Sequence, residues 1–362
     1  MPEPVLLTVS GTIPVDIEEQ VRQGKRPQAD YLALAKRFHA DLLDVSAARQ
    51  RAGWLGRLLE RVGGSPLLLA WVCFTIRRQY RVIFTDGEQV GIPLAFFLKF
   101  FARGHRPVHL MIAHILSVGK KQIFFDLFGL HTHIDTFFVY STWQKHFIEQ
   151  RWKIAGERVI FTPFMVDDTF FSPARGNPGN LPFINKDGRP VICSAGLEQR
   201  DYSTLMDAVE GLNVQMVIAA ASPWSKRSDS THRRTIPSNV EVVKLSQFEL
   251  RDLYAASQFV IMPLIPVNFQ AGVTAILEAL AMEKAVLCSL IPGQTDVIQE
   301  NVNGHYVRVG DAPALRHAIL EMLEAREDVQ RMGQRGRYLV EEQMSLAHYT
   351  ERLAKYVESD IN

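Results

Sequence analysis

The chain has 362 residues, of which 22% are charged, and a formal net charge of +1. This length exceeds one typical domain core and suits two, and the balanced charge gives no overall positive field of the kind that attracts nucleic acid. Cys73, Cys193 and Cys288 lie far apart within apolar runs, which gives neither a disulfide framework nor metal-ligand spacing. The first residues lack the pattern of a secretory signal. We therefore expect a two-domain cytoplasmic protein that has no nucleic-acid partner.

Strand-like apolar runs in the first half of the chain end repeatedly in small or polar residues. The runs are 5–9 before Ser10-Gly11-Thr12, 82–85 before Asp86, 108–112 before Ala113-His114, and 137–140 before Ser141. This recurrence predicts a doubly wound domain whose strand ends form one wall of a ligand cleft. His114 is either a ligand contact or a buried core histidine, and Asp86 and Glu88 are expected to cap the helix that starts near Gly91.

Residues 54–81 complicate a purely soluble interpretation. Residues 54–61 are amphipathic, and residues 66–76 form an apolar run followed by Arg77, Arg78 and Arg81. A helix needs about 20 apolar residues to span a bilayer, so this run is too short. We expect a buried core helix, and the alternative is an interfacial helix whose basic flank contacts the inner face of the membrane.

A change in composition marks the boundary between the two domains. Prolines and glycines between residues 172 and 186 interrupt any regular element. We therefore predict a first domain at residues 1–172 and a second at residues 173–342. A C-terminal helix at residues 343–362 is expected to pack back on the first domain.

The second half alternates strands and helices, most clearly at residues 259–311. A strand-like run at 259–262 is followed by a loop ending in Gln270-Ala271-Gly272, an apolar helix, and further strand-like runs at 285–289 and 305–309. This order predicts a parallel sheet whose ligands lie beyond the carboxyl ends of its strands. The helix N-terminus after Gly272 offers unpaired N–H groups and a positive dipole end, which suit a phosphate.

One carboxylate, Glu278, lies within this otherwise apolar helix. Its neighbours include Ile276, Leu277 and Leu280, a composition typical of a helix buried on most sides. Burying an unpaired carboxylate is costly, so Glu278 either pairs with a basic side chain or accepts a hydrogen bond from a ligand hydroxyl. The loop and the helix terminus beside it favour the ligand.

Residues 269–311 resemble the nucleotide-sugar-binding signature of retaining glycosyltransferases of the GT-B fold, the large family-four group. The family motif is a glutamate, seven residues, and a second glutamate. Glu278 matches the second position and Gln270 occupies the first. The resemblance implies that Glu278 holds ribose hydroxyls and that Gln270 contacts the transferred sugar through hydrogen bonds without a charge.

Other segments resemble the same family in the same order. Residues 194–209 resemble the strand, glycine loop and helix that open the donor domain, where Arg200 matches the second of two basic residues that hold the pyrophosphate. The first is absent, and Lys226 in a later loop is its expected substitute. Residues 239–264 resemble the segment where the nucleotide base rests against backbone near Lys244 and Leu245.

The resemblance completes the expected site. The donor-binding set comprises Gly11, Arg200, Lys226, Lys244, Leu245, Ala271, Gly272, Val273, Thr274 and Glu278, and the catalytic pair comprises His114 and Gln270. His114 resembles the family histidine that contacts the donor sugar or the acceptor. Arg200 has a simpler alternative as a solvated surface side chain.

The resemblance implies two Rossmann-like doubly wound domains that face each other across a cleft. The implied reaction moves a sugar from a UDP- or GDP-sugar to the hydroxyl of a glycan, lipid-linked or small-molecule acceptor, with retention at the anomeric carbon. No metal or other cofactor is expected. Two alternatives stay open: a nucleotide-sugar epimerase of the same fold, and a catalytically silent partner subunit, which Gln270 and the missing basic residue favour.

Overall fold

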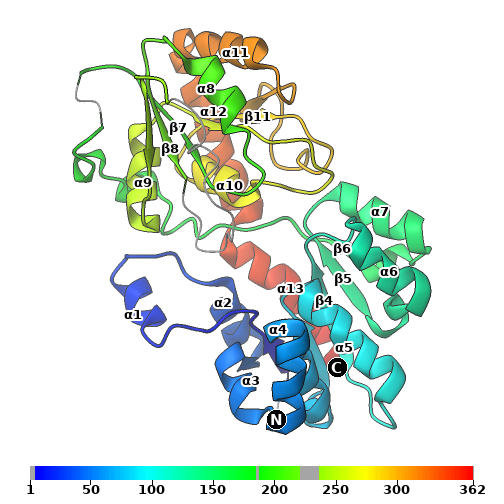
Figure 1. Cartoon of the computed structure of the whole chain (residues 1–362). Coiled ribbons are helices and arrows are strands. Elements are labelled where there is room, and N and C mark those ends of the chain that lie inside the picture. Colours follow the sequence, from blue (N-terminus) through cyan, green and yellow to red (C-terminus); the bar gives the residue numbers. More distant parts are fainter. Residues whose placement is uncertain (1–4, 185–186, 221–235, 362) are drawn as a thin grey trace. The chain divides into compact units, whose positions relative to one another are not determined.

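The computed structural model describes residues 5–184, 187–220 and 236–361 (Figure 1). Its internal contacts divide the chain into two compact units. Unit 1 comprises Met1–Glu19, Gln28–Pro163 and Ala347–Asn362, and unit 2 comprises Gln20–Pro27 and Phe164–Leu346. The boundary after Pro163 thus precedes the one suggested by the sequence at residue 172. The reason is that Val166, Phe170 and Phe171 are buried in the core of unit 2.

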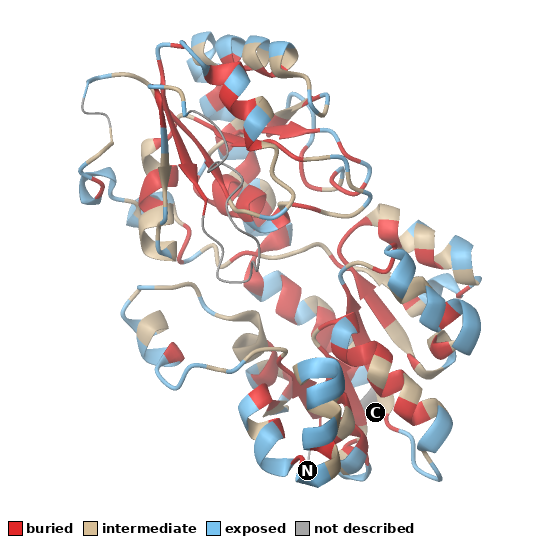
Figure 2. Ribbon diagram, viewed as in Figure 1, coloured by how far each residue is buried: buried red, intermediate tan, exposed pale blue. Residues whose placement is uncertain are grey.

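Unit 1 contains a parallel six-stranded sheet in the order β2-β1-β3-β4-β5-β6. The strands are β1 (Val5–Thr8), β2 (Asp41–Leu43), β3 (Val82–Thr85), β4 (Val108–Ala113), β5 (Thr136–Val139) and β6 (Val159–Phe161). The central strands are buried along their whole length, as Figure 2 shows in red. Near-continuous Val, Ile, Leu and Phe runs suit this position, because helices cover both faces of a parallel sheet.

The helices of unit 1 follow the strands in chain order. They are α1 (Ile17–Arg22, whose last residues belong to unit 2), α2 (Asp30–Phe38), α3 (Val45–Arg51), α4 (Gly53–Ile76), α5 (Glu88–Phe101), α6 (Gly119–Phe128), α7 (Thr142–Trp152) and the C-terminal α13 (Leu346–Ile361). Helix α13 contacts the sheet of unit 1 through Tyr349, whose hydroxyl lies 3.0 Å from that of Tyr140, and through Tyr356, which packs on Phe138.

Helix α4 consists of two helical parts. Gly64 has a non-helical conformation at φ 71°, and Pro66 starts the second part. Residues of the second part, such as Leu68 and Val72, are fully buried, as expected for a core helix. Gly53–Gln79 is long and apolar enough to cross a membrane by length and composition, and 33% of its qualifying 18-residue window is buried. Its break and its buried second part are features of a core helical hairpin.

Unit 2 contains a second parallel six-stranded sheet, in the order β12-β11-β10-β7-β8-β9. The strands are β7 (Val191–Ala195), β8 (Gln215–Ala219), β9 (Val240–Val243), β10 (Val260–Met262), β11 (Val286–Ser289) and β12 (Gly304–Val307), and the helices are α8 (Tyr202–Val209), α9 (Gln247–Ala256), α10 (Val273–Ala281), α11 (Ala312–Glu324) and α12 (Arg326–Leu339). A π-helix, Val340–Met344, joins α12 to α13.

Two hydrophobic clusters lie on opposite faces of this sheet. Cys193 and Ala195 of β7 belong to the cluster that holds α9 and α10, whereas Ile192 belongs to the cluster that holds α8 and α11. Alternate residues of one strand therefore point to opposite helical layers. Both units are doubly wound α/β structures, which confirms the fold class predicted from the sequence.

Helix α12 packs closely on the turn after α10 through Gly333. A Cβ atom at this position would collide with the backbone carbonyl oxygen of Glu283. We expect Gly333→Ala to destabilise the protein by about 1–3 kcal/mol, because the helix must move away, even though alanine favours a helix by about 1 kcal/mol over glycine. Urea-induced unfolding measures the change.

The control is Gly119→Ala, at the first position of α6, where an added Cβ meets no atom within 4 Å. This variant should be neutral or slightly stabilising. Equal stability changes in the two variants would contradict the close approach at Gly333.

Candidate active site in unit 2

The loops that follow β7 and β10 are joined by backbone hydrogen bonds. The N–H of Asp201 donates to the carbonyl of Pro263 at 2.9 Å, and the N–H of Ile265 donates to the carbonyl of Gln199 at 3.1 Å. Gln199 has a positive φ of 59° at this junction. These bonds bring the residue that follows, Arg200, to the same edge of the sheet as the loop before α10.

Arg200 lies at the carboxyl end of β7, above Gly196. Its Nε donates to the carbonyl of Ala195 at 2.9 Å and its Nη1 to the carbonyl of Glu198 at 2.7 Å. A Cβ on Gly196 would lie 2.5 Å from the Arg200 guanidinium. Burial lowers the pKa of Arg200, but an arginine remains charged at neutral pH. Arg200 is therefore a partly buried, positioned cation rather than a freely solvated side chain.

Helix α10 begins at a glycine that no other residue can easily replace. Gly272 has φ 79°, and a Cβ there would lie 2.9 Å from Sδ of Met262. The first helical bond runs from the Ile276 N–H to the Gly272 carbonyl, and no side chain caps this terminus. The preceding N–H groups, of Val273, Thr274 and Ala275, have no intrahelical acceptor. Unpaired N–H groups and the positive end of the helix dipole are the features that attract anions to helix N-termini.

Glu278 is the buried carboxylate of α10, with 7% of its surface exposed. Its Oε2 accepts a hydrogen bond of 3.0 Å from the hydroxyl of Tyr254, on α9. Burial raises the pKa of Glu278 to about 7, although the Tyr254 hydrogen bond and the charge of Arg200 act to lower it. Among the described residues its hydrogen-bond partner is therefore a hydroxyl and not a cation.

Gln270 lies in the loop between β10 and α10. Its side-chain oxygen and nitrogen are shielded from solvent and have no hydrogen-bond partner among the described residues. Gln294, which follows β11, has the same property. The two loops touch, because a Cβ on Gly293 would collide with the backbone of Phe269. Buried amides without partners are rare in proteins, and they are expected where a polar ligand or water binds.

The other predicted residues of unit 2 follow the edge strand β9 or lie at the start of α10. Lys244 is exposed, and Leu245 packs against the core between β9 and α9. Ser246 caps α9 by accepting from the N–H of Glu249, whose carboxylate in turn accepts from the N–H of Ser246. Ala271, in the loop before α10, is buried, and Thr274, in the first turn of α10, is exposed. Lys226 lies outside the described residues.

The two predicted residues of unit 1 follow β4 and β1. His114 is exposed, so the alternative of a buried core histidine is wrong. Its Nε2 lies 2.9 Å from the carbonyl of Asp86, and its backbone N–H donates to Glu88 at 2.8 Å. Gly11 is partly exposed, and its carbonyl accepts from the N–H of Val45.

The prediction that Asp86 and Glu88 cap a helix is wrong. The N-cap of α5 is Gly87, and no side chain caps it. Asp86 accepts instead from the hydroxyl of Thr8 at 2.7 Å, and burial raises its pKa. Glu88 accepts from the Lys121 ammonium at 2.6 Å. Both carboxylates join neighbouring strand ends, which are distant in sequence.

Three residues of the site were missed by sequence reasoning. Tyr254 is missed because its link to Glu278 depends on how α9 packs against α10. Gly196 has a weak signal, since a glycine follows the apolar run of β7. Gln294 carries no signal in sequence, because only its burial without partners distinguishes it.

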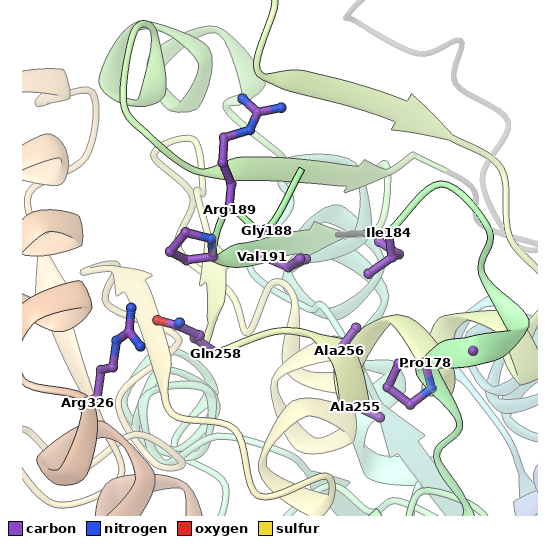
Figure 3. Close-up of a pocket in the computed structure, with 11 residues that line it drawn as sticks. Pro178, Ile184, Gly188, Arg189, Val191, Ala255, Ala256, Gln258 and Arg326 are labelled. Carbon is purple, nitrogen blue, oxygen red and sulfur yellow. The ribbon is translucent and has the colours of Figure 1, made fainter. Parts of the chain in front are cut away.

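The structure also has a pocket of about 610 Å³ at the opposite edge of the same sheet (Figure 3). Its lining includes Pro190 and Val191 at the start of β7, Gln258 before β10, and the side chains of Arg189 and Arg326. Ligands of parallel sheets bind beyond the carboxyl ends of the strands. The candidate site is therefore the edge that carries Arg200, Gly272 and Glu278, and not this pocket.

Residues 189–325 match the family model of glycosyl transferases group 1. This match covers the sheet and most helices of unit 2, and the whole chain has the fold of GT-B glycosyltransferases. The family recognition made from the sequence is thus confirmed at the level of this domain and fold.

Several solved structures share this fold over the full chain. Sucrose-phosphate synthase from Thermosynechococcus elongatus has a TM-score of 0.73 and 18% identity, covering 99% of this chain and 98% of that chain. Anabaena HepE, solved in complex with UDP and glucose, has a TM-score of 0.71 and 13% identity, covering 99% and 100%. A glycosyltransferase from Rickettsia africae has a TM-score of 0.71 and 14% identity, covering 100% and 99%. A comparison with curated proteins found no match.

Glu278→Gln tests the buried charge in the unliganded protein. The variant keeps an oxygen that accepts from Tyr254 and removes the ionisable group. The pKa of the Glu278 carboxyl rises from 4.5 in the unfolded chain to about 7 in the folded one. The protonated carboxyl therefore contributes its full stabilisation below pH 4.5, and this stabilisation is lost as the pH rises through about 7. The gain in unfolding free energy from the variant should be about 2 kcal/mol larger near pH 8 than near pH 5.

Urea unfolding of the wild type and the variant at both pH values measures this difference. Glu324→Gln, at the exposed end of α11, is the control and should show no such pH dependence. A gain that is the same at both pH values would refute the raised pKa.

Proposed function

We propose that this protein is a retaining glycosyltransferase that moves a sugar from a UDP- or GDP-sugar to an acceptor hydroxyl. The observation that carries the proposal is Glu278, a buried carboxylate whose Oε2 accepts a hydrogen bond from the Tyr254 hydroxyl. Ribose hydroxyls donate to its other oxygen. HepE, which has the same fold, was solved with UDP-glucose, and this supports a nucleotide-sugar donor.

The positive groups of unit 2 then bind the diphosphate. In this proposal its oxygens accept from the Arg200 guanidinium and from the N–H groups that open α10 after Gly272. As the bond between the anomeric carbon and the diphosphate breaks, negative charge grows on the departing oxygen. Fixed donors aimed at that charge stabilise the transition state. Lys226 is proposed to add a second cation, and with these groups the reaction requires no metal.

The neutral amide of Gln270 is proposed to hold a hydroxyl of the transferred sugar. Its buried oxygen and nitrogen need partners, and a sugar hydroxyl can both donate to one and accept from the other. The acceptor oxygen forms its new bond on the face that the diphosphate leaves, and its proton passes out with the departing group or to solvent. His114 is proposed to contact the donor sugar or the acceptor.

We propose the acceptor and the cellular location only as broad classes. We propose a cytoplasmic enzyme whose acceptor is a glycan, a lipid-linked molecule or a small molecule. Contact with the inner face of the membrane through residues 54–81 would use the first part of α4, where Trp54 and Val62 are each 77% exposed. The second part of α4 is buried in the core of unit 1.

A catalytically silent subunit is the second candidate function. Gln270 favours it, because the family glutamate carries a charge that this amide lacks. Such a subunit would bind the nucleotide and turn over nothing. Release of UDP or GDP from a bound sugar donor in the presence of acceptor separates the two candidates, and conversion of the donor without acceptor would indicate an epimerase.

Glu278→Ala should weaken nucleotide-sugar binding about 10- to 100-fold, because the ribose loses a charged hydrogen-bond acceptor. Thermal shift with UDP, GDP, ADP and their sugar conjugates identifies the donor first, since a ligand that binds the folded state raises its stability. Titration calorimetry with that donor then compares the variant with the wild type.

Glu321→Ala, which removes an exposed carboxylate of α11, is the matched control and should leave the affinity unchanged. Unchanged affinity in Glu278→Ala, with the fold intact by circular dichroism, would refute the proposed ribose contact.

Gln270→Ala should lower kcat/KM for sugar transfer about 10- to 100-fold, because one or two hydrogen bonds to the sugar are lost. The affinity for the free nucleoside diphosphate should stay within about twofold, since that ligand carries no sugar to contact. The anomeric configuration of the product, read by NMR, tests retention. A fall in nucleotide affinity as large as the fall in kcat/KM would show that Gln270 acts on the loop instead.

A further inference from the structure

Helix α6 is apolar on two opposite sides although it lies at the surface of unit 1. Phe125 points inward, is 2% exposed, and packs on Trp152 at 4.7 Å. Ile123, Phe124, Leu127 and Phe128 lie on the outer side and are 50%, 41%, 75% and 40% exposed. Figure 2 colours most of this helix as exposed. A solvated helix normally carries polar residues on its outer face.

The end of α5 extends this apolar area. Phe100 and Phe101 are 50% and 58% exposed. The rings of Phe100 and Phe128 meet at right angles with centroids 6.3 Å apart, and the Lys99 ammonium donates to the carbonyl of Phe128 at 2.7 Å. We name this area the α5–α6 apolar surface: Phe100, Phe101, Ile123, Phe124, Leu127 and Phe128. Single exposed apolar residues are common, but six on two helices that meet at Phe100 and Phe128 indicate an interaction site.

Basic residues predominate in the segment that carries this surface. Between Glu88 and Asp126 the sequence contains no acidic residue, and it contains Lys99, Arg103, Arg106, Lys120 and Lys121. Lys120 and Arg103 are exposed. Lys120 precedes Ile123 and Phe124 by three and four residues, so it lies on the same side of α6.

The acidic groups nearby are each paired with a basic group, which leaves Lys120 and Arg103 as the exposed cations named above. Asp126 accepts from Arg151 at 2.6 Å and from the Trp152 indole at 2.8 Å, on the side of α6 that packs on α7. Asp135 accepts from Arg106 at 2.6 Å, and Glu88 accepts from Lys121. The outer face of α6 therefore presents aromatic and aliphatic groups next to a positive rim.

We propose that the α5–α6 apolar surface docks on an anionic lipid bilayer. Phenylalanine and aliphatic side chains enter the boundary between headgroups and acyl chains, while Lys120 and Arg103 contact lipid phosphates. A second copy of the chain fits less well, because a symmetric interface would bring these cations together. The proposal concerns a different surface from the first part of α4 and does not depend on the donor site.

The test is sedimentation of the full chain with vesicles of phosphatidylcholine alone and of phosphatidylcholine mixed with phosphatidylglycerol. The wild type should bind the mixed vesicles, and added salt should weaken the binding. The double variant Ile123→Gln/Leu127→Gln should bind at least about tenfold more weakly, because two exposed side chains no longer enter the lipid. Its thermal midpoint should not fall, since both side chains are exposed in the folded protein.

Two further variants make the test specific. Lys120→Gln should lower binding to the mixed vesicles about fivefold, since each basic residue near an anionic surface contributes about that factor. Leu320→Gln, an exposed leucine on α11 of unit 2, is the matched control and should bind as the wild type does.

Three outcomes would overturn the proposal. The first is a wild type that sediments with neither kind of vesicle. The second is a loss of binding in Leu58→Gln/Val62→Gln on α4 with full binding retained in Ile123→Gln/Leu127→Gln, which would assign the contact to α4. The third is a dimer in solution that Ile123→Gln/Leu127→Gln dissociates without any vesicle binding by the wild type, which would assign the surface to a second copy of the chain.

Discussion

The fixed position of α10 is the constraint on which the candidate site depends. Its start is held by the left-handed turn at Gly272 against Met262, and its end by the approach of Gly333 to Glu283. The Arg337 guanidinium donates to the carbonyl of Ala281, at the last residue of the helix. Because the uncapped N-terminal N–H groups and the carboxylate of Glu278 belong to this one helix, their spacing does not change when the loops around them move.

The site keeps its opposite charges apart. Arg200 donates to the backbone carbonyls of Ala195 and Glu198, and Glu278 accepts from the Tyr254 hydroxyl, so no ion pair joins these two described residues. Pairing them would satisfy both groups within the protein and would leave neither for a ligand. The unliganded protein instead tolerates a buried carboxylate with a raised pKa. Such local cost is typical of sites selected for binding and not for stability.

Sequence reasoning found what a single segment encodes and missed what distant segments create together. Local sequence is enough to predict the apolar strands, Gly272 and Glu278, because burial and turn geometry depend on neighbouring residues. Tyr254 is invisible because α9 brings it to Glu278 from 24 positions away. Asp86 is predicted as a cap because it precedes a helix. The sheet order places Thr8 of β1 beside β3, however, and the Thr8 hydroxyl donates to the Asp86 carboxylate. The boundary between the units lies after Pro163 and not at residue 172, because Phe170 and Phe171 pack in the core of unit 2.

Apart from the short segment Gln20–Pro27, the chain passes from unit 1 to unit 2 after Pro163 and returns after Leu346. Val166, beside the first of these two passages, forms a bridge with Ser345, beside the second. Apart from Gln20–Pro27, unit 2 is one continuous stretch, whereas unit 1 needs Ala347–Asn362, including Tyr349 for the buried Tyr140 hydroxyl. On the ribosome, domains generally fold in the order of their synthesis. In this chain, unit 2 is synthesised second but can complete its core first. Unit 1 can complete its core only after α13 has left the exit tunnel.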